Sequence, residues 1–399
     1  MIQVGLDRLL DSVEVLRGRR YGVVAHSASV SAEMVPIQLA LARAGAPLPV
    51  RMFGPEHGFF GVEQDMVPSA DSSDPWTGVP IVSLYGESED SLRPDGSAFS
   101  GLDLVLVDLQ DVGARYYTYA ATAIWSAAAA LVEGCEVWVL DRPNPLGGEQ
   151  IEGNIRQQGF ESFVGAFETP VRHGLTLAEV MRWQLSRAGV DTGGLKEWKM
   201  AGWRREMSWR STGRRWVAPS PNLPTPRIAR VYPGACLLEA TSISEGRGTT
   251  RPFELFGSPT VQPVDLADRL NATDLRGARF VPTYFRPQFH KHAGEVCGGV
   301  QWIVEDSVTL EPYRCGIEIV RALAETDPGF SWREEPYEFV RDIPAIDLLV
   351  GTSVLRRALE GAADLDEWLA SWREDERRFR AETLPFHLYE SERDRGGDL

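Results

Sequence analysis

Glu56 is the residue in this sequence best suited to general acid–base catalysis. It stands in the segment Gly54-Pro55-Glu56-His57-Gly58, in which proline restricts the backbone and Gly58 permits a tight turn. A carboxyl group partly desolvated in such a loop has a raised pKa, as a general acid requires. The same glutamate could instead cap a helix or brace the loop. His57 could orient Glu56, contact a substrate or simply pack within the loop.

Further polar candidates follow other apolar segments of the chain. Asp111 is either a second catalytic carboxylate or a turn cap before Gly113, and Arg115 either binds an anionic group or pairs with Asp111. Asn144 has proline on both sides, a rigid setting that suits a positioned contact. The candidate substrate-binding residues in this part of the chain are therefore His26, Arg115, Tyr116, Asp141, Arg142 and Asn144, although Asp141 and Arg142 could also brace a turn.

Three more candidates lie later in the chain. His173 precedes a helical pattern and could contact a ligand from the N-terminus of that helix. Glu245 and Arg247 lie in a glycine-rich segment that could act as a lid or an anion clamp. The same segment could merely join two domains.

The segments ahead of the first candidates predict a buried sheet. They are rich in β-branched residues and continuous in hydrophobicity, which is typical of strands covered on both faces. The predicted strands are 20–25, 49–53, 80–84, 104–109 and 136–140, and helical patterns occupy 32–44, 117–132 and 176–187. Thr176 and Glu179 have capping-box spacing at the start of the last helix. This alternation, which ends near Lys196, predicts an α/β fold with a mostly parallel sheet. Ligands bind such sheets beyond the carboxyl ends of the strands, where the candidates fall.

The common cofactor motifs of such folds are missing. The first strand is followed by AHSASVS, which lacks GxGxxG, and the chain contains neither GxxxxGK[ST] nor the GxSxG nucleophile motif. His290 and His292 have weak metal-ligand spacing without a third ligand nearby. The sequence therefore predicts no cofactor and no metal.

Charge and composition restrict the partners. The 41 Lys and Arg residues against 57 Asp and Glu residues give a net charge of −16, which argues against nucleic acid or an anionic membrane as the main partner. A small-molecule substrate remains. No signal peptide or membrane span is evident, and the four cysteines are widely spaced. We expect buried free thiols and a cytoplasmic protein.

Seven motifs, in order along the chain, resemble those of the DUF1343 family, which includes the exo-β-N-acetylmuramidases called NamZ. They are FGPEHGFFG (53–61), DLQDVGARYYTY (108–119), DRPNPLGG (141–148), PVRHGLTLAE (170–179), SPNLP (220–224), SEGRGTTRPFELFG (244–257) and FRPQFHKHAGEVCGGVQ (285–301). Family members usually carry Thr-Asn-Gln-Thr after the first strand, whereas this chain has Ala25-His26-Ser27-Ala28.

The resemblance implies a fold and an activity. It implies a Rossmann-like catalytic domain, here residues 1–258, and a smaller α+β auxiliary domain, residues 259–399, that closes a cleft. It also implies release of terminal N-acetylmuramic acid from peptidoglycan fragments, with Glu56 as the catalytic glutamate. The lactyl carboxylate of that sugar needs a cation, for which Arg115, Arg142 and Arg247 are the candidates. A cell-wall amidase or esterase, or a non-catalytic muropeptide-binding protein, are the alternatives.

The C-terminal part of the chain ends in an amphipathic helical pattern and a polar tail. Trp368 and Trp372 lie one turn apart in ADLDEWLASWREDERRFRAE, and we expect them to pack rather than to bind a ligand. The last ten residues, 390–399, are expected to form a solvated tail.

Overall fold

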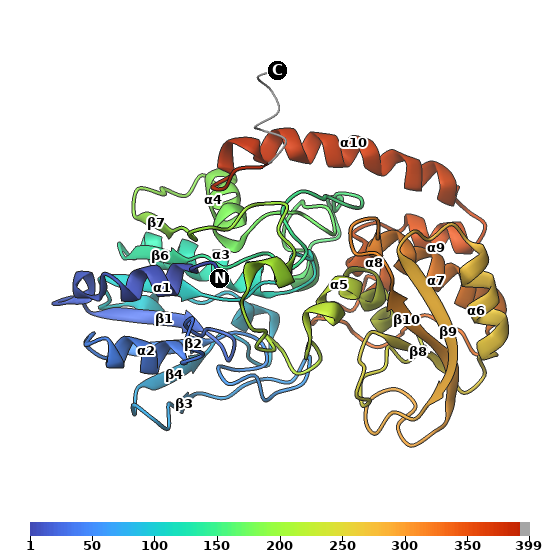
Figure 1. Ribbon diagram of the computed structural model, residues 1–399, viewed down its shortest axis with the longest axis horizontal. Helices are drawn as coiled ribbons and strands as arrows, with labels where there is room; N and C mark the ends of the chain where they lie inside the picture. The colour runs from blue at the N-terminus through green and yellow to red at the C-terminus, as the bar shows by residue number, and fades with distance from the viewer. Residues whose placement is uncertain (392–399) are drawn as a thin grey trace.

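Six parallel strands form the sheet of the first of two units (Figure 1). In this computed structural model, which describes residues 1–391, the strands are β1 (Tyr21–Ala25), β2 (Arg51–Gly54), β4 (Pro80–Ser83), β5 (Leu104–Asp108), β6 (Glu136–Leu140) and β7 (Leu195–Trp198). The short β3 (Ser72–Ser73) pairs antiparallel with β4. The order β3-β4-β2-β1-β5-β6-β7 places the parallel strands in the 3-2-1-4-5-6 sequence of a Rossmann sheet. The five predicted strands and the α/β class are confirmed.

Two helical layers cover this sheet. α3 (Tyr119–Val132) and α4 (Leu177–Arg187) share one hydrophobic core with alternate side chains of the central strands, such as Val105 and Val107. α1 (Gly5–Leu10) and α2 (Ile37–Arg43) share a second core with the intervening residues on the opposite face. The predicted capping box of α4 is confirmed, because the Thr176 hydroxyl accepts a hydrogen bond from the Glu179 N–H and the Glu179 carboxylate accepts one from the Thr176 N–H.

The second unit surrounds a three-stranded antiparallel sheet with the order β8-β10-β9. Its strands are β8 (Leu255–Ser258), β9 (Ala278–Phe285) and β10 (Cys297–Val304), and its helices are α5 (Pro226–Ala235), α6 (Pro263–Ala272), α7 (Pro312–Thr326), α8 (Ala345–Val350), α9 (Val354–Leu359) and α10 (Leu365–Thr383). The predicted division at residue 258 would leave β8 in the first domain, whereas β8 pairs with β10. We propose that the second unit begins at α5 instead.

Helix α10 runs across both units, along the top of Figure 1. Near its start, Trp372 stacks on Tyr313 of α7, with ring centroids 4.8 Å apart. Near its end, Glu382 accepts a hydrogen bond from Trp183 of α4. Beyond the helix, the Tyr389 hydroxyl donates to Asp141 at the end of β6. The two tryptophans of α10 pack as predicted, and residues 392–399 of the expected tail lie outside the described residues.

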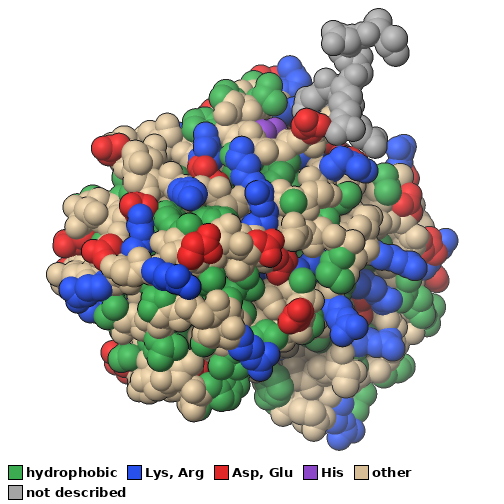
Figure 2. All heavy atoms as spheres, turned by 60° about the vertical axis from the view of Figure 1, so that its left-hand side comes forward, with side chains coloured by type: hydrophobic (Ala, Val, Ile, Leu, Met, Phe, Trp, Pro, Cys, Tyr) green, Lys and Arg blue, Asp and Glu red, His purple; other side chains and the backbone are tan. Residues whose placement is uncertain are grey.

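Three general properties bear on the predictions made from composition: the state of the cysteines, the distribution of surface charge and the length of the apolar helices. All four cysteines are buried and free, as expected. On the face drawn in Figure 2, basic and acidic side chains are interspersed rather than gathered by sign. Within residues 1–391, no helix is long and apolar enough to cross a membrane.

Candidate active site

A small polar pocket lies where the carboxyl edge of the parallel sheet meets the second unit. Its cavity volume is about 40 Å³. The first unit contributes residues that follow β2 and β5, and the second contributes residues from the loops after α5 and α7. The side chains that carry polar groups into its wall are Glu56, His57, Asp65, Tyr116, Tyr117, Thr118, Ser220, Asn222, Tyr232, Glu239, Arg247, Tyr337 and Glu338.

Glu56 is placed in this wall by the turn that follows β2. His57 and Gly58 both have left-handed backbone angles, φ 69° and φ 73°, which reverse the chain immediately after Glu56. The glutamate is only 5% exposed. Its carboxylate accepts hydrogen bonds from the Thr118 hydroxyl at 2.7 Å and from the Met66 N–H at 3.3 Å. Glu56 is thus held by hydrogen-bond donors, and no ion pair to it occurs within residues 1–391.

His57 and Tyr116 also line the pocket, but each has a partner of its own. The Nδ1–H of His57 donates to the Glu63 carbonyl at 3.0 Å, which ties down the loop that carries Glu56. The Tyr116 hydroxyl donates to the carbonyl of Pro233 in α5, across the junction of the two units. Both residues therefore shape the pocket as well as facing it.

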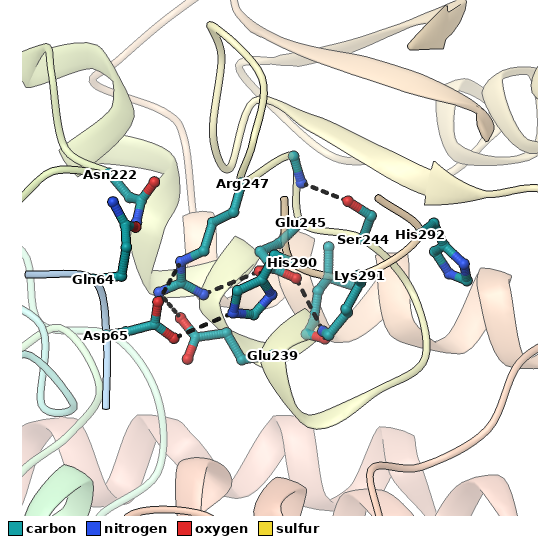
Figure 3. Close-up of polar contacts among 12 residues, drawn as sticks. Gln64, Asp65, Asn222, Glu239, Ser244, Glu245, Arg247, His290, Lys291 and His292 are labelled. Atoms are coloured by element: carbon teal, nitrogen blue, oxygen red, sulfur yellow. Dashed lines mark hydrogen bonds and ion pairs between the residues drawn. The ribbon is translucent and has the colours of Figure 1, made fainter. Parts of the chain in front are cut away.

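Arg247 is the centre of a buried ion-pair cluster at the side of the pocket (Figure 3). Its guanidinium lies 3.0 Å from Glu239, 3.0 Å from Glu245 and 3.4 Å from Asp65. Asp65 belongs to the loop after Glu56, so the cluster joins the two units. Lys291 adds a further contact to Glu245 at 2.9 Å. The predicted Glu245–Arg247 segment thus reaches the pocket, with Arg247 lining it and Glu245 behind.

The charges of this cluster stabilise one another. Burial raises the pKa of Glu245, but Lys291, Arg247 and His290 outweigh burial and lower it to about 2. Burial likewise opposes the charge of Asp65, yet Arg247 and His290 hold the pKa of its carboxyl below the ordinary value. Both carboxylates are therefore ionised at neutral pH.

Two of the three arginines proposed to bind an anionic group do not line the pocket. Arg115 is buried and donates to the carbonyls of Asn154, Thr169, Leu349 and Val350 at 2.7–2.9 Å. Arg142 pairs with Asp108 at the end of β5 and donates to the Val30 carbonyl. Both guanidinium groups satisfy buried acceptors that hold loops together. Among the described pocket residues, Arg247 is the one arginine or lysine.

Asp111 also lies outside the pocket wall. It caps a turn, because its carboxylate accepts the Gly113 N–H at 2.6 Å. His173 approaches the same carboxylate at 3.7 Å. Burial and the nearby Arg205 lower the pKa of His173 to about 4, so its imidazole is neutral at pH 7 and this contact is not an ion pair. The structure therefore favours the turn-cap interpretation of Asp111.

The three remaining candidates are buried in similar bracing positions. Asp141 accepts hydrogen bonds from Tyr389 and from the Ala178 N–H at the start of α4. Asn144 donates to the Leu175 carbonyl at 2.9 Å. His26 accepts the Gln110 N–H and donates to the Pro219 carbonyl. Burial and the charge of Arg142 lower the pKa of His26 to about 3, so this imidazole is neutral as well.

Asp111→Asn should keep turnover within about threefold of the parent while changing the pH dependence of stability. Burial raises the pKa of Asp111 to about 7, against an ordinary value of 3.8. A raised carboxyl pKa gives stability that is present at low pH and lost as the pH rises from about 4 to 7. Asparagine can still cap the Gly113 N–H. We therefore expect the variant to unfold at a higher temperature than the parent at pH 8, with little difference at pH 4. A loss of turnover of 100-fold or more would restore Asp111 as a catalytic group.

Several acidic and phenolic residues of the pocket wall were not predicted from the sequence, among them Asp65, Glu239, Tyr337 and Glu338. The Tyr337 hydroxyl donates to Glu239 at 2.6 Å and so extends the Arg247 cluster along the wall. Asp65 follows Glu56 by nine residues, and this closeness in the chain was the one feature of the sequence that could have marked Asp65 as a site residue. Glu239 and Glu338 come from the second unit, where no local motif marks them.

The pocket residues offer acid–base chemistry. No group of three or more His, Cys, Asp or Glu side chains within residues 1–391 is arranged to hold a metal ion. Carboxyl groups, phenols and a guanidinium suit proton transfer to and from a polar ligand. The fold and the pocket thus define a class: a Rossmann-ordered α/β protein whose sheet edge, closed by a smaller unit, holds a carboxyl-rich pocket.

Comparison with known proteins gives the family. Two family models match in succession, Exo-beta-N-acetylmuramidase NamZ, N-terminal, over residues 21–227 and its C-terminal counterpart over residues 230–389. The Bacillus subtilis (strain 168) protein named Peptidoglycan beta-N-acetylmuramidase NamZ is 34% identical over 390 residues, which is 97% of this chain and 91% of that protein. The chain belongs to the NamZ family.

Solved structures agree over nearly the whole chain. A DUF1343 family protein from Bacteroides fragilis matches with a TM-score of 0.84 and 29% identity, covering 98% of this chain and 99% of that one. A second DUF1343 family protein from the same organism matches with a TM-score of 0.75 and 25% identity, with the same coverage. The resemblance inferred from the seven motifs is confirmed.

Proposed function

We propose that this protein is an exo-acting β-N-acetylmuramidase that releases a terminal β-linked N-acetylmuramic acid from peptidoglycan fragments. The observation that carries the proposal is the match, over almost its entire length, to a relative named for that activity. The buried Glu56 in the pocket wall supports it. A Glu56 held in an ion pair would favour a muropeptide-binding protein without catalytic activity. The Glu56 carboxylate instead accepts two hydrogen bonds from neutral donors.

In this proposal Glu56 is the general acid. Glycoside hydrolysis needs a proton for the departing oxygen and a second group that assists attack on the anomeric carbon. Glu56 lies on the loop that follows a strand at the carboxyl edge, where ligands of such sheets bind. The Thr118 and Met66 hydrogen bonds fix the carboxyl group in one orientation, which is the pre-organisation that proton transfer requires.

The two units must separate for a sugar to enter. A cavity of about 40 Å³ has room for roughly three water molecules, which is less than a sugar ring occupies. Its wall combines residues of both units, so a change in their relative position would widen it. A small pocket of this kind fits the end of a glycan better than its interior, in keeping with exo-action.

The test is a comparison of two para-nitrophenyl glycosides, those of β-N-acetylmuramic acid and β-N-acetylglucosamine. The comparison is informative because four acidic residues, Glu56, Asp65, Glu239 and Glu338, line the pocket, whereas Arg247 is the one arginine or lysine among the described lining residues. Charge alone therefore does not explain selection of an anionic sugar. We expect para-nitrophenol release from the muramic acid glycoside only. Release from the neutral sugar alone, or no hydrolysis of either glycoside or of the natural disaccharide, would contradict the proposal.

A further inference from the structure

A strained turn of the second unit contributes Glu338 to the pocket that Glu56 also lines. The backbones of Tyr337 and Val340 exchange hydrogen bonds of 3.1 and 3.0 Å, so Glu338 and Phe339 are the two central residues. These have φ angles of 47° and 69°. Positive φ at both central positions is the pattern of a type I′ turn, which normally takes asparagine or glycine. Two larger residues keep this conformation only where their surroundings hold them there.

The surroundings that hold the turn belong to the first unit. The Tyr85 hydroxyl, after β4, donates a hydrogen bond to the Glu338 carboxylate at 3.3 Å. The ring of Phe339 packs against the Tyr85 ring with centroids 6.0 Å apart. Tyr85 is itself buried, against Phe163. The strained turn thus serves to carry one carboxyl group, that of Glu338, across the junction into the pocket that contains Glu56.

Within residues 1–391, Glu338 lacks the cationic partner that a buried structural glutamate normally has. It is 6% exposed, and no ion pair to it occurs within residues 1–391. Arg247, the nearby cation, contacts Asp65, Glu239 and Glu245 instead. Buried carboxyl groups are normally paired, because an unpaired charge in the interior is costly.

The charges that face Glu338 are negative. Burial raises the pKa of Glu338 well above its ordinary value, and the nearby Glu56, Glu239 and Asp65 raise it further, against an opposite effect of the Tyr85 hydrogen bond. A raised pKa makes the ionised form of Glu338 a stronger base than an ordinary carboxylate.

We propose that Glu338 is the second catalytic carboxyl group of this site and works with Glu56 across the junction of the two units. The inference rests on the proposed glycosidase function. Glu56 gives its proton to the glycosidic oxygen while the bond from that oxygen to the anomeric carbon breaks and the bonding electrons stay on the oxygen. Water attacks the anomeric carbon as ionised Glu338 accepts a proton from it. Return of that proton from Glu338 to Glu56 restores the starting pair.

The test uses the full-length protein with two substrates, the para-nitrophenyl glycoside of N-acetylmuramic acid and the disaccharide in which this sugar precedes N-acetylglucosamine. Glu338→Gln should lower kcat on both substrates by about 100-fold or more, because a general base is lost whatever the leaving group. Glu56→Gln should affect the disaccharide far more, because para-nitrophenolate departs without protonation. Glu335→Gln, an exposed glutamate three residues earlier, is the matched control and should behave as the parent.

A further variant separates catalysis from structure. Azide should restore turnover of Glu338→Ala and yield the glycosyl azide, because an anionic nucleophile needs no base, whereas a merely structural loss would not respond. If Glu338→Gln unfolds at a much lower temperature than the parent, the Glu338→Asp variant is tested in its place. Its kcat should fall at least tenfold, because the shorter side chain moves the carboxylate away from the attacking water. A Glu338→Gln or Glu338→Asp enzyme with kcat within threefold of the parent, while Glu56→Gln is impaired, overturns this inference alone. Failure of the parent protein on both substrates overturns the proposed function instead.

Discussion

Glu56→Gln is expected to lower kcat for the disaccharide of N-acetylmuramic acid and N-acetylglucosamine by about 10³-fold, the effect of losing a positioned general acid. Glutamine has nearly the same shape and can still accept the hydrogen bond from the Thr118 hydroxyl or the Met66 N–H. It has no acidic proton to give to the departing oxygen. We therefore expect the temperature of unfolding and KM to change little, so that the loss appears in kcat.

The control for this experiment is Glu87→Gln, which removes the same charge from an exposed residue after β4. Its kcat should equal that of the parent. Initial rates of disaccharide cleavage and thermal unfolding, measured side by side on the three proteins, decide the matter. A Glu56→Gln enzyme that retains a third or more of the parental kcat would remove Glu56 from the role of acid.

Arg247→Met should lower the free energy of unfolding by about 3–5 kcal/mol at pH 7, the usual cost of removing one partner from a buried ion pair. The substitution leaves Asp65, Glu239 and Glu245 buried without the guanidinium that they share. Because Asp65 belongs to the first unit, the loss should also weaken the junction that encloses the pocket. Urea denaturation measures the first effect, and a rise in KM for the disaccharide would report the second.

The pH dependence of this effect follows from Glu245. Its pKa, about 2 in the folded protein, lies below the ordinary 4.5, so its contribution to stability is present above about pH 4.5 and is lost as the pH falls toward 2. The stability difference between Arg247→Met and the parent should therefore shrink at pH 3. Arg251→Met, an exposed arginine in the same loop, should cost little at either pH. Equal stability of Arg247→Met and the parent at pH 7 would show that the cluster is not what holds the junction.

The first unit could be predicted because its strands have a simple signature. Segments such as 104–107 are buried on both faces and are apolar at every position. β7 (Leu195–Trp198) escaped prediction because it lies at the edge of the sheet, where exposed Lys196 and half-buried Glu197 interrupt the apolar pattern. α5 escaped for a different reason, since its two prolines, Pro226 and Pro233, obscured a helix that begins with one of them.

The candidate site was predicted less completely than the fold. Polar residues that end parallel strands look alike in sequence whether they face a ligand or brace a loop. Arg115 shows why, since its acceptors are main-chain carbonyls, which leave no trace in residue types. Glu56 stood out because Pro55 and the flanking glycines, Gly54 and Gly58, restricted the conformation of its loop. Glu338 could not be found, because its proximity to Glu56 depends on the packing of Phe339 and Tyr85, residues far apart in the chain.

The return of the chain from α10 to the first unit has a consequence for biosynthesis. Tyr389 donates to Asp141, accepts the Met200 N–H through its hydroxyl, and packs edge-on against Trp203 at 4.9 Å between centroids. These contacts complete the core beneath β6 and β7, yet residue 389 is synthesised only after the whole second unit. Although domains generally fold from the N-terminus as they are made, this Rossmann unit stays unfinished until the second unit has been synthesised. Separate expression of the first unit should therefore give an incomplete fold, and the two units should unfold together as one cooperative entity.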